Sequence, residues 1–173
     1  MACGNGHAPA PTALTGSQLR AMDSAGLARL GEESLRSHLV DTAIAAHQLY
    51  SPLDPDRLEA FLEDRNFVRH PVRIQYEIGN MAPHQFANPE QQADRFLLNV
   101  HPQLQGRAED LALAIAYFIP VLNYGALIND DHCLIYGATL HGLTIEEYYR
   151  QLCRIAALTG AAPRDRNEPG DRF

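Results

Sequence analysis

The stretch VRHPVRIQYEI, residues 68–78, decides the fold class, because the apolar residues change here from helical spacing to alternation. Over residues 68–78 apolar side chains take even positions and polar side chains take odd ones: the apolar residues are Val68, Val72, Ile74, Tyr76 and Ile78, and the polar ones are Arg69, Arg73, Gln75 and Glu77. Successive side chains of a β-strand point to opposite faces of the sheet, so this pattern predicts a half-buried strand.

The next alternating stretch is RFLLNVH, residues 95–101, and we interpret the two stretches as an antiparallel pair. The buried face of the second strand is expected to hold Phe96, Leu98 and Val100, and the other face Asn99 and His101. The connection between them, GNMAPHQFANPEQQAD at residues 79–94, is longer than a hairpin turn. Long loops inside compact domains are more often functional or disordered than neutral, so the connection belongs to the predicted functional surface.

Helical spacing surrounds these strands. We predict helices over residues 17–31 and 32–50, a short one that starts at Pro55 after an Asp54 cap, and one from residue 107 that kinks or breaks near Pro120. Two more begin at residues 129–130 and at a Thr144–Glu147 capping box. The predicted fold is α+β and predominantly helical, with about six helices packed around a short two-stranded antiparallel β-hairpin. Since an isolated hairpin is barely stable in water, helices must cover it or a partner chain must complete it, and we expect a homodimer or another protein partner.

One short sequence element occurs twice, as NYGALI at residues 123–128 and IYGATL at residues 135–140. The period of twelve residues is too short for a solenoid repeat. We interpret each Tyr-Gly-Ala piece as a separate place where a small residue lets two helices approach closely.

Composition excludes several classes of protein. All 14 positive side chains are arginine, so the chain has no Schiff-base lysine for pyridoxal phosphate and no P-loop lysine for nucleoside triphosphates. The net charge of -7 argues against a nucleic-acid partner, because such proteins present a basic surface to phosphates.

The three cysteines, Cys3, Cys133 and Cys153, are odd in number and widely spaced, which predicts free thiols and a cytoplasmic location. Residues 1–16 lack the charged and apolar regions of a signal peptide, and we expect them to form a flexible leader. Residues 161–173 are expected to form a flexible polar tail after a single domain at residues 17–160.

The most apolar segment, residues 111–128, runs for 18 residues without a charge, which reaches the lower limit for a transmembrane helix. Pro120, Asn123 and Gly125 interrupt its second half, and Asn129 and two aspartates follow in place of arginine or aromatic anchors. We therefore predict a central buried helix and no membrane partner.

Charge and histidine point to the strands as the functional surface. Residues 108–149 carry six acidic side chains and no arginine, whereas residues 67–107 have a charge of +1 and three of the eight histidines. Glu77, His84 and His101 are the candidate ligands of a divalent transition metal, Zn or Fe, because imidazole and carboxylate suit both. His132 adds a ligand if its helix start points toward the strands.

Arg73 and Arg95 are the candidate residues for an anionic group, because guanidinium binds carboxylate or phosphate through paired hydrogen bonds. If the strands pair with Arg73 near Asn99 and Glu77 near Arg95, these residues share one face. The alternative is a solvated sheet face with ordinary cross-strand pairs, which any half-exposed strand shows.

The predicted function is therefore a small-ligand or metal-binding protein. If it is an enzyme, a metal would activate water and a histidine or Glu77 would accept the proton. The alternative is a non-catalytic accessory or structural subunit that acts through helix or strand-edge interfaces. For that role the tyrosines of the carboxyl-terminal half offer contact area, although burial in the core explains them equally well: Tyr117, Tyr124, Tyr136, Tyr148 and Tyr149.

Overall fold

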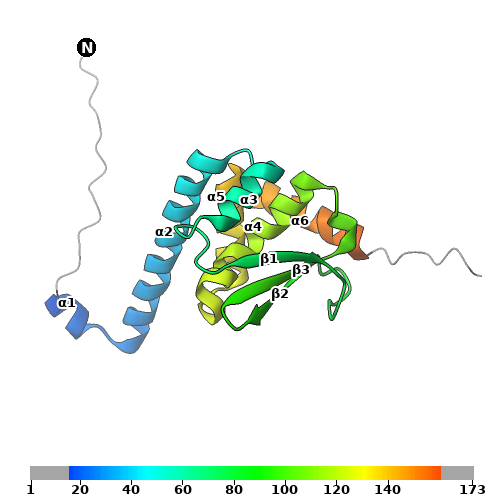
Figure 1. The fold of residues 1–173 in the computed structure, drawn as a ribbon. Helices are drawn as coiled ribbons and strands as arrows, with labels where there is room; N and C mark the ends of the chain where they lie inside the picture. Colours follow the sequence, from blue (N-terminus) through cyan, green and yellow to red (C-terminus); the bar gives the residue numbers. More distant parts are fainter. Residues whose placement is uncertain (1–15, 161–173) are drawn as a thin grey trace, which may run out of the picture. The chain divides into compact units, whose positions relative to one another are not determined.

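A computed structural model describes residues 16–160 of the chain, which divides into two compact units after Ser37. The first unit holds α1 (Gly16–Ala21) and the start of α2 (Ser24–Tyr50) (Figure 1). The prediction that a helix ends near Gly31 is wrong, because α2 continues through it. The break lies at Asp23 instead, whose carboxylate accepts a hydrogen bond from the Gly26 N–H at 2.7 Å, as a capping residue does.

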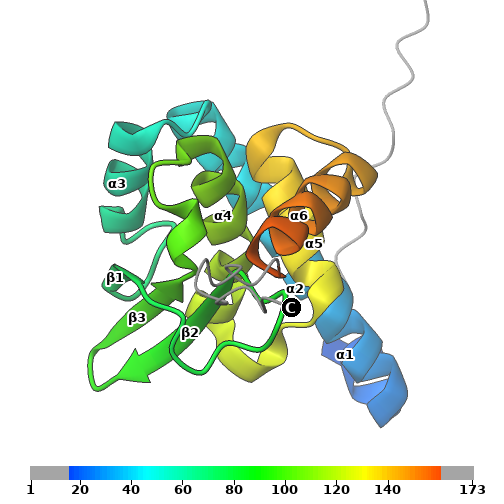
Figure 2. The same cartoon turned by 90° about the vertical axis from the view of Figure 1, so that its right-hand side faces the viewer.

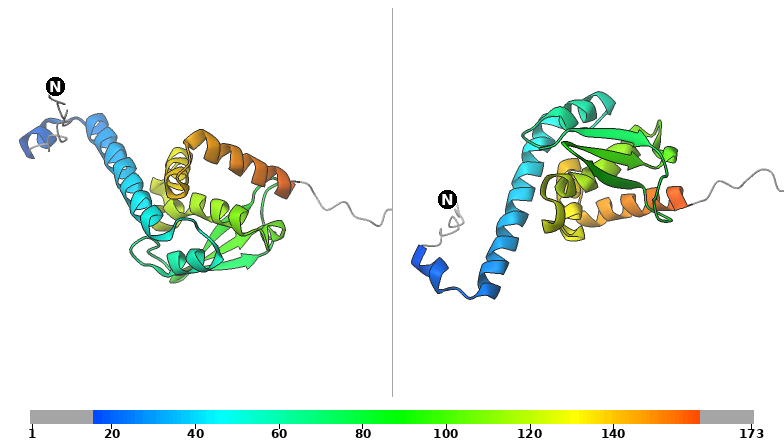
Figure 3. Two further views of the ribbon diagram at one scale, coloured as in Figure 1. Left: turned by 90° about the horizontal axis from the view of Figure 1, so that it is seen from above. Right: turned by 60° about the horizontal axis from the view of Figure 1, so that its bottom comes forward.

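The second unit contains the end of α2 and all later elements, and it confirms the α+β, predominantly helical class. Its elements are α3 (Pro55–Glu63), β1 (Val72–Tyr76), β2 (Ala87–Gln92), β3 (Arg95–Val100), the 3-10 helix η1 (Pro102–Leu104), α4 (Ala108–Tyr124), the 3-10 helix η2 (Gly125–Leu127), α5 (Asp130–His141) and α6 (Ile145–Gly160). Helix α4 is central, since it contacts α3, β2, α5 and α6. Figures 2 and 3 show the sheet on one side of α4 and the α5–α6 pair on another.

The sheet differs from the predicted hairpin in strand number and direction, and its first strand is shorter than predicted, since β1 covers Val72–Tyr76 and not residues 68–78. It has three strands in the order β1-β3-β2, with β3 parallel to β1 and antiparallel to β2. The tight turn at Ala93 and Asp94, with Ala93 at φ 43°, places β2 and β3 side by side. The predicted connection therefore contributes a strand, ANPEQQ, which has no apolar alternation and was not recognisable from the sequence.

The antiparallel register is also wrong, because the parallel pairing sets Arg73 opposite Leu97 and Gln75 opposite Asn99. The predicted shared face of Arg73, Gln75, Arg95 and Asn99 nevertheless exists, since it depends on alternation and not on direction. Asn99 of the central strand β3 and His101, which directly follows β3 and caps η1, are buried, at 6% and 8% exposure.

Helix α4 confirms the predicted central buried helix, with eight buried residues along its 17. By length and composition alone the segment Ala108–Leu127 would also suffice to cross a membrane. Of the predicted kink or break near Pro120, the break is wrong, because α4 continues through Pro120 to Tyr124 and ends at Gly125, whose φ of 56° favours glycine.

Of the two Tyr-Gly-Ala pieces, only the second brings helices together. A Cβ on Gly137 of α5 would lie 2.2 Å from the ring Cζ and the hydroxyl of Tyr148 in α6. Tyr148 is fully buried and donates a hydrogen bond to the Leu113 carbonyl of α4 at 2.7 Å. Gly125 has open space around it and serves to end α4, so the prediction of a close approach there is wrong.

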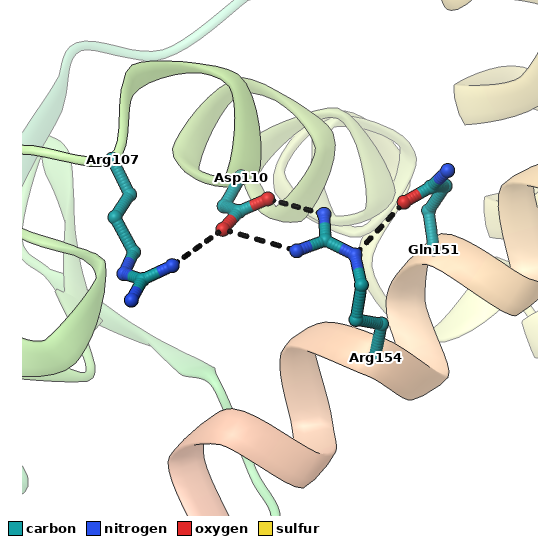
Figure 4. Close-up of polar contacts among 4 residues, drawn as sticks. All are labelled: Arg107, Asp110, Gln151 and Arg154. Atoms are coloured by element: carbon teal, nitrogen blue, oxygen red, sulfur yellow. Dashed lines mark hydrogen bonds and ion pairs between the residues drawn. The ribbon is translucent and has the colours of Figure 1, made fainter.

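A buried carboxylate joins α4 to α6 (Figure 4). Asp110, with a side chain only 9% exposed, accepts a 2.5 Å hydrogen bond from Arg154, and Arg107 lies 3.6 Å from its other oxygen. Gln151 in turn accepts from Arg154 at 3.0 Å, which orients the guanidinium. This network fixes the relative position of two helices that line the cavity described next.

The helix starts follow the predicted caps. The Asp54 carboxylate accepts from the Arg57 N–H at 2.9 Å, and Thr144 and Glu147 form the capping box before α6. Asn129 caps α5. These starts are local features, which is why the sequence alone predicts them.

Candidate ligand-binding site

A cavity of about 420 Å³ lies between the chain that leads into β2 and the helices α4, α5 and α6. The polar contributors to its wall are His84, Gln85, Tyr117, Asp130, Tyr149 and Cys153, and the apolar contributors are Phe86, Phe118, Leu134, Leu152 and Ala156. Its volume falls within the usual range for small-molecule sites, about 300–1,000 Å³. The predicted functional connection, residues 79–94, therefore supplies one wall.

Three aromatic rings form the apolar part nearest this connection. The Phe86 ring packs edge to face on Phe118 at 5.7 Å and on Tyr117 at 6.1 Å, and the latter two rings are 5.3 Å apart. Such T-shaped pairs hold ring positions more tightly than area burial alone. The wall is thus preformed, and its aromatic edges suit a flat or apolar ligand.

Tyr117 and the exposed Asp130 form a hydrogen-bonded polar pair in the cavity wall. The Tyr117 hydroxyl donates a hydrogen bond to Asp130 Oδ1 at 2.8 Å. Burial, and then this bond to a carboxylate, raise the pKa of Tyr117 well above its ordinary value, so the phenol stays protonated. The second carboxylate oxygen, Asp130 Oδ2, has no hydrogen-bond partner among residues 16–160. It is available to a ligand that donates a hydrogen bond or carries a positive charge.

His84 lines the cavity in an unusual backbone conformation, with φ at 66°. A Cβ on Gly160, at the end of α6, would lie 1.8 Å from His84 Nδ1, so only glycine lets the imidazole sit there. A left-handed histidine stores strain that surrounding structure must compensate, and such residues gather at functional sites. Of the predicted metal ligands, His84 is the one that the fold places in the cavity wall.

The two thiols of the described chain differ sharply. Cys153 is exposed and lines the cavity. Cys133 is buried, and its burial, together with the nearby Asp130 charge, raises the pKa of its thiol to about 12. Of these two thiols, Cys153 is therefore the one that reacts with reagents near neutral pH.

The remaining predicted metal ligands serve local structure. Glu77 is exposed and accepts a hydrogen bond from the Gln75 amide. His101 is buried, which lowers its pKa, and its Nδ1 accepts from the Gln103 N–H at 3.3 Å. His132 completes the cap of α5, with Nδ1 accepting from the Asn129 N–H at 3.3 Å.

Within residues 16–160, no three His, Cys, Asp or Glu side chains are grouped so that they could hold one metal ion. The fold thus does not bring Glu77, His84, His101 and His132 together as one ligand set. The metal site stays a prediction that direct measurement must decide.

The candidate anion residues lie on the same face of the sheet, on neighbouring strands. Arg73 is opposite Leu97, and Arg95 precedes Leu97 by two residues. Both arginines are exposed, and Arg95 Nε bonds Asp94 at 3.3 Å, which leaves Arg73 as the free cation of this pair among the described residues.

The cavity residues that the sequence did not reveal are Tyr117, Asp130 and Cys153. They come from three helices, so no spacing along the chain links them. The sequence feature that does point to the cavity is the long connection before β3, because it forms one of the cavity walls.

Neither a family model, nor a curated protein, nor a solved structure matches this chain. The function of the cavity must therefore be argued from its geometry and chemistry.

Proposed function

We propose that this protein binds a small, mostly apolar molecule that carries one hydrogen-bond donor or one positive charge. The observation that carries the proposal is the cavity itself, in which aromatic and aliphatic side chains line the wall beside an exposed, hydrogen-bonded Tyr117–Asp130 pair. Binding sites for small molecules commonly combine such walls with a few fixed polar groups.

The polar pair determines which ligand head group fits. The Tyr117 hydroxyl uses its hydrogen on Asp130, and Asp130 belongs to no ion pair in the described part of the chain. A carboxylate in a mainly apolar wall favours an amine over an acid, because an acid would place two like charges together. An apolar amine therefore fits better than an apolar carboxylate.

This proposal keeps the predicted small-ligand function but moves the site from the polar face of the strands to the cavity beside them. We place the protein in the cytoplasm, which the free thiols Cys133 and Cys153 support. No catalytic step is assigned, and binding is the function we propose.

The test is titration with 1-naphthylmethylamine, an apolar aromatic amine, monitored by calorimetry. With about 12 non-hydrogen atoms at roughly 0.3–0.5 kcal/mol each, we expect a Kd of about 0.04–2 mM. Asp130→Asn keeps the shape but removes the charge, and should weaken binding about tenfold or more. Its matched control is Asp131→Asn, because Asp131 is exposed like Asp130 but does not line the cavity.

Two further measurements locate the bound amine. It should slow the reaction of Cys153 with N-ethylmaleimide, and 1-naphthylacetate, with the same rings and a negative charge, should bind at least about tenfold more weakly. The proposal is wrong if amine and acid bind equally, if Asp130→Asn and Asp131→Asn behave alike, or if Cys153 is not protected.

The predicted Zn or Fe site is tested separately by elemental analysis of protein made without an affinity tag. A resident site would give about one metal ion per chain, falling in His84→Ala and His101→Ala variants. Less than about one ion per ten chains, unchanged in both variants, would reject the metal prediction.

A further inference from the structure

Strand β1 presents an open edge. It pairs with β3 only, and the bonds Phe96 N–H to Pro71 O at 2.8 Å and Glu77 N–H to Val100 O at 3.0 Å show that its odd-numbered residues face β3. In a parallel ladder the even-numbered residues then direct both backbone polar groups outward. Within residues 16–160, the N–H and C=O groups of Val72, Ile74 and Tyr76 have no hydrogen-bond partner along this edge.

The opposite edge of the sheet is protected. His101 donates to the Phe86 carbonyl at 2.9 Å, so Asn88 and Glu90 of β2 also face β3, and Pro89 faces outward. Proline has no N–H and is typical of edges that must not pair. β1 lacks proline, and it is the edge of this sheet that can accept another strand.

A groove accompanies the open edge between β1 and α3, which lies above β1 in Figure 2. It measures about 470 Å³, and Leu58 and Leu62 of α3, Val72 and Ile74 of β1, and Leu111 of α4 contribute apolar surface. A second hollow of about 280 Å³ shares Leu58 and Leu111 and reaches Tyr76, which is 36% exposed. Apolar surface therefore accompanies the whole length of β1.

Charges around the groove differ between its two sides. Glu59 and Glu63 line the α3 side, so acidic side chains are disfavoured inside the groove. Arg65 also lines it, but its guanidinium already donates to the carbonyls of Val68 and His70, at 3.0 and 2.9 Å. Arg73 lines the groove on the β1 side, alternates in β1 with Val72 and Ile74 and so belongs to the other face of the sheet, and forms no ion pair among the described residues.

We propose that the β1 edge binds an extended peptide segment of a partner protein, which adds to the sheet as a fourth strand. Its alternate apolar side chains occupy the groove beneath α3, and an acidic side chain on its outer face pairs with Arg73. Strand addition of this kind takes its affinity from main-chain hydrogen bonds and its specificity from alternate side chains. Cross-strand neighbours lie about 5 Å apart, within reach of an Arg–Glu pair. This binding site is separate from the cavity. It gives a place on the molecule to the protein partner that the sequence predicts for an incompletely covered strand pair.

The test uses the peptide Ac-Thr-Val-Glu-Val-Thr-Val-NH2 and amide hydrogen exchange measured by NMR. At saturation we expect the amide hydrogens of Val72, Ile74 and Tyr76 to exchange at least about tenfold more slowly than without peptide. The amides of Arg73 and Gln75 already bond β3, so their exchange rates should change little. Two N-methylated peptides provide the control, each blocking one alternate set of amides. One should lose binding and the other keep it, because only one set faces β1.

The charge is tested by Arg73→Glu, with Arg95→Glu as its control on the same face of the sheet but away from the open edge. Arg73→Glu should weaken the glutamate peptide about fivefold and strengthen its lysine counterpart, whereas Arg95→Glu should change neither. The proposal is wrong if both N-methylated peptides bind alike, or if 1 mM peptide leaves the three outward amides unchanged. It is equally wrong if those amides are already protected in a dimer of the chain without peptide, because a second copy would then occupy the edge.

Discussion

Replacing Gly137 by alanine tests the packing that builds the helical half of the molecule. A Cβ at this position would lie 2.2 Å from two atoms of the Tyr148 side chain, whereas carbon atoms in contact need about 3.4 Å or more. The ring must therefore move by about 1.2 Å or the helices must separate. Neither is easy, because Tyr148 is fully buried and bonded to the Leu113 carbonyl at 2.7 Å.

The expected magnitude follows from three contributions. Overpacking of a core costs about 1–3 kcal/mol, and an unsatisfied buried hydroxyl and carbonyl about 1–3 kcal/mol. Alanine in place of glycine within a helix offsets about 1 kcal/mol of this. We expect Gly137→Ala to lower the free energy of unfolding by about 3 kcal/mol, which corresponds to a fall in Tm of roughly 9 °C for a domain of this size.

The matched control is Gly31→Ala, a helical glycine of α2 with no heavy atom within 4 Å of its added Cβ. It should leave the unfolding free energy unchanged or raise it by up to about 1 kcal/mol. Urea unfolding followed by far-ultraviolet circular dichroism and by tyrosine fluorescence measures both variants. If Gly137→Ala unfolds at the same urea concentration as the unsubstituted protein, the close approach of α5 and α6 is refuted.

Three other predictions concern charge, protonation and the thiols. Arg154→Ala should lower the unfolding free energy by about 1–2 kcal/mol, because its partner carboxylate is buried. Arg150→Ala breaks an exposed pair on the same helix and should lower it by about 0.3–0.5 kcal/mol. Equal losses in urea unfolding would contradict the buried network. Burial lowers the pKa of His101, so as pH falls below 6.5 the imidazole is protonated in the unfolded chain before it is protonated in the folded one. His101 therefore does not affect the unfolding free energy above that pH and lowers it below that pH. His101→Gln should flatten the decline in Tm on acidification. Mass-spectrometric mapping of N-ethylmaleimide adducts at neutral pH should show Cys153 modified within minutes and Cys133 only after unfolding; comparable rates would mean that Cys133 is not buried.

The parts of the fold that the sequence predicts are those set by nearby residues. Asp54, Asn129 and Thr144 each cap the helix that follows them, and the alternation after residue 72 sets the two faces of β1. The direction of pairing is different, because it depends on β2, whose sequence ANPEQQ carries no strand pattern of its own. That segment is a strand because the turn at Ala93 brings it beside β3, which is a property of tertiary structure.

The same reasoning explains why the candidate site was only half predictable. Strand periodicity places histidine and glutamate on one face, which is why they are predicted as ligands. In the structure, however, His101 is buried and caps η1, and His132 caps α5. The cavity instead takes its polar pair from two helices, where Tyr117 is typical of a core residue and Asp130 of a helix start. Each residue alone has an ordinary structural explanation, and only the 2.8 Å contact across α4 and α5 gives them a shared role. A site of this kind becomes visible through tertiary packing, and the Gly137–Tyr148 contact and the Asp110–Arg154 pair are what hold its helices in register.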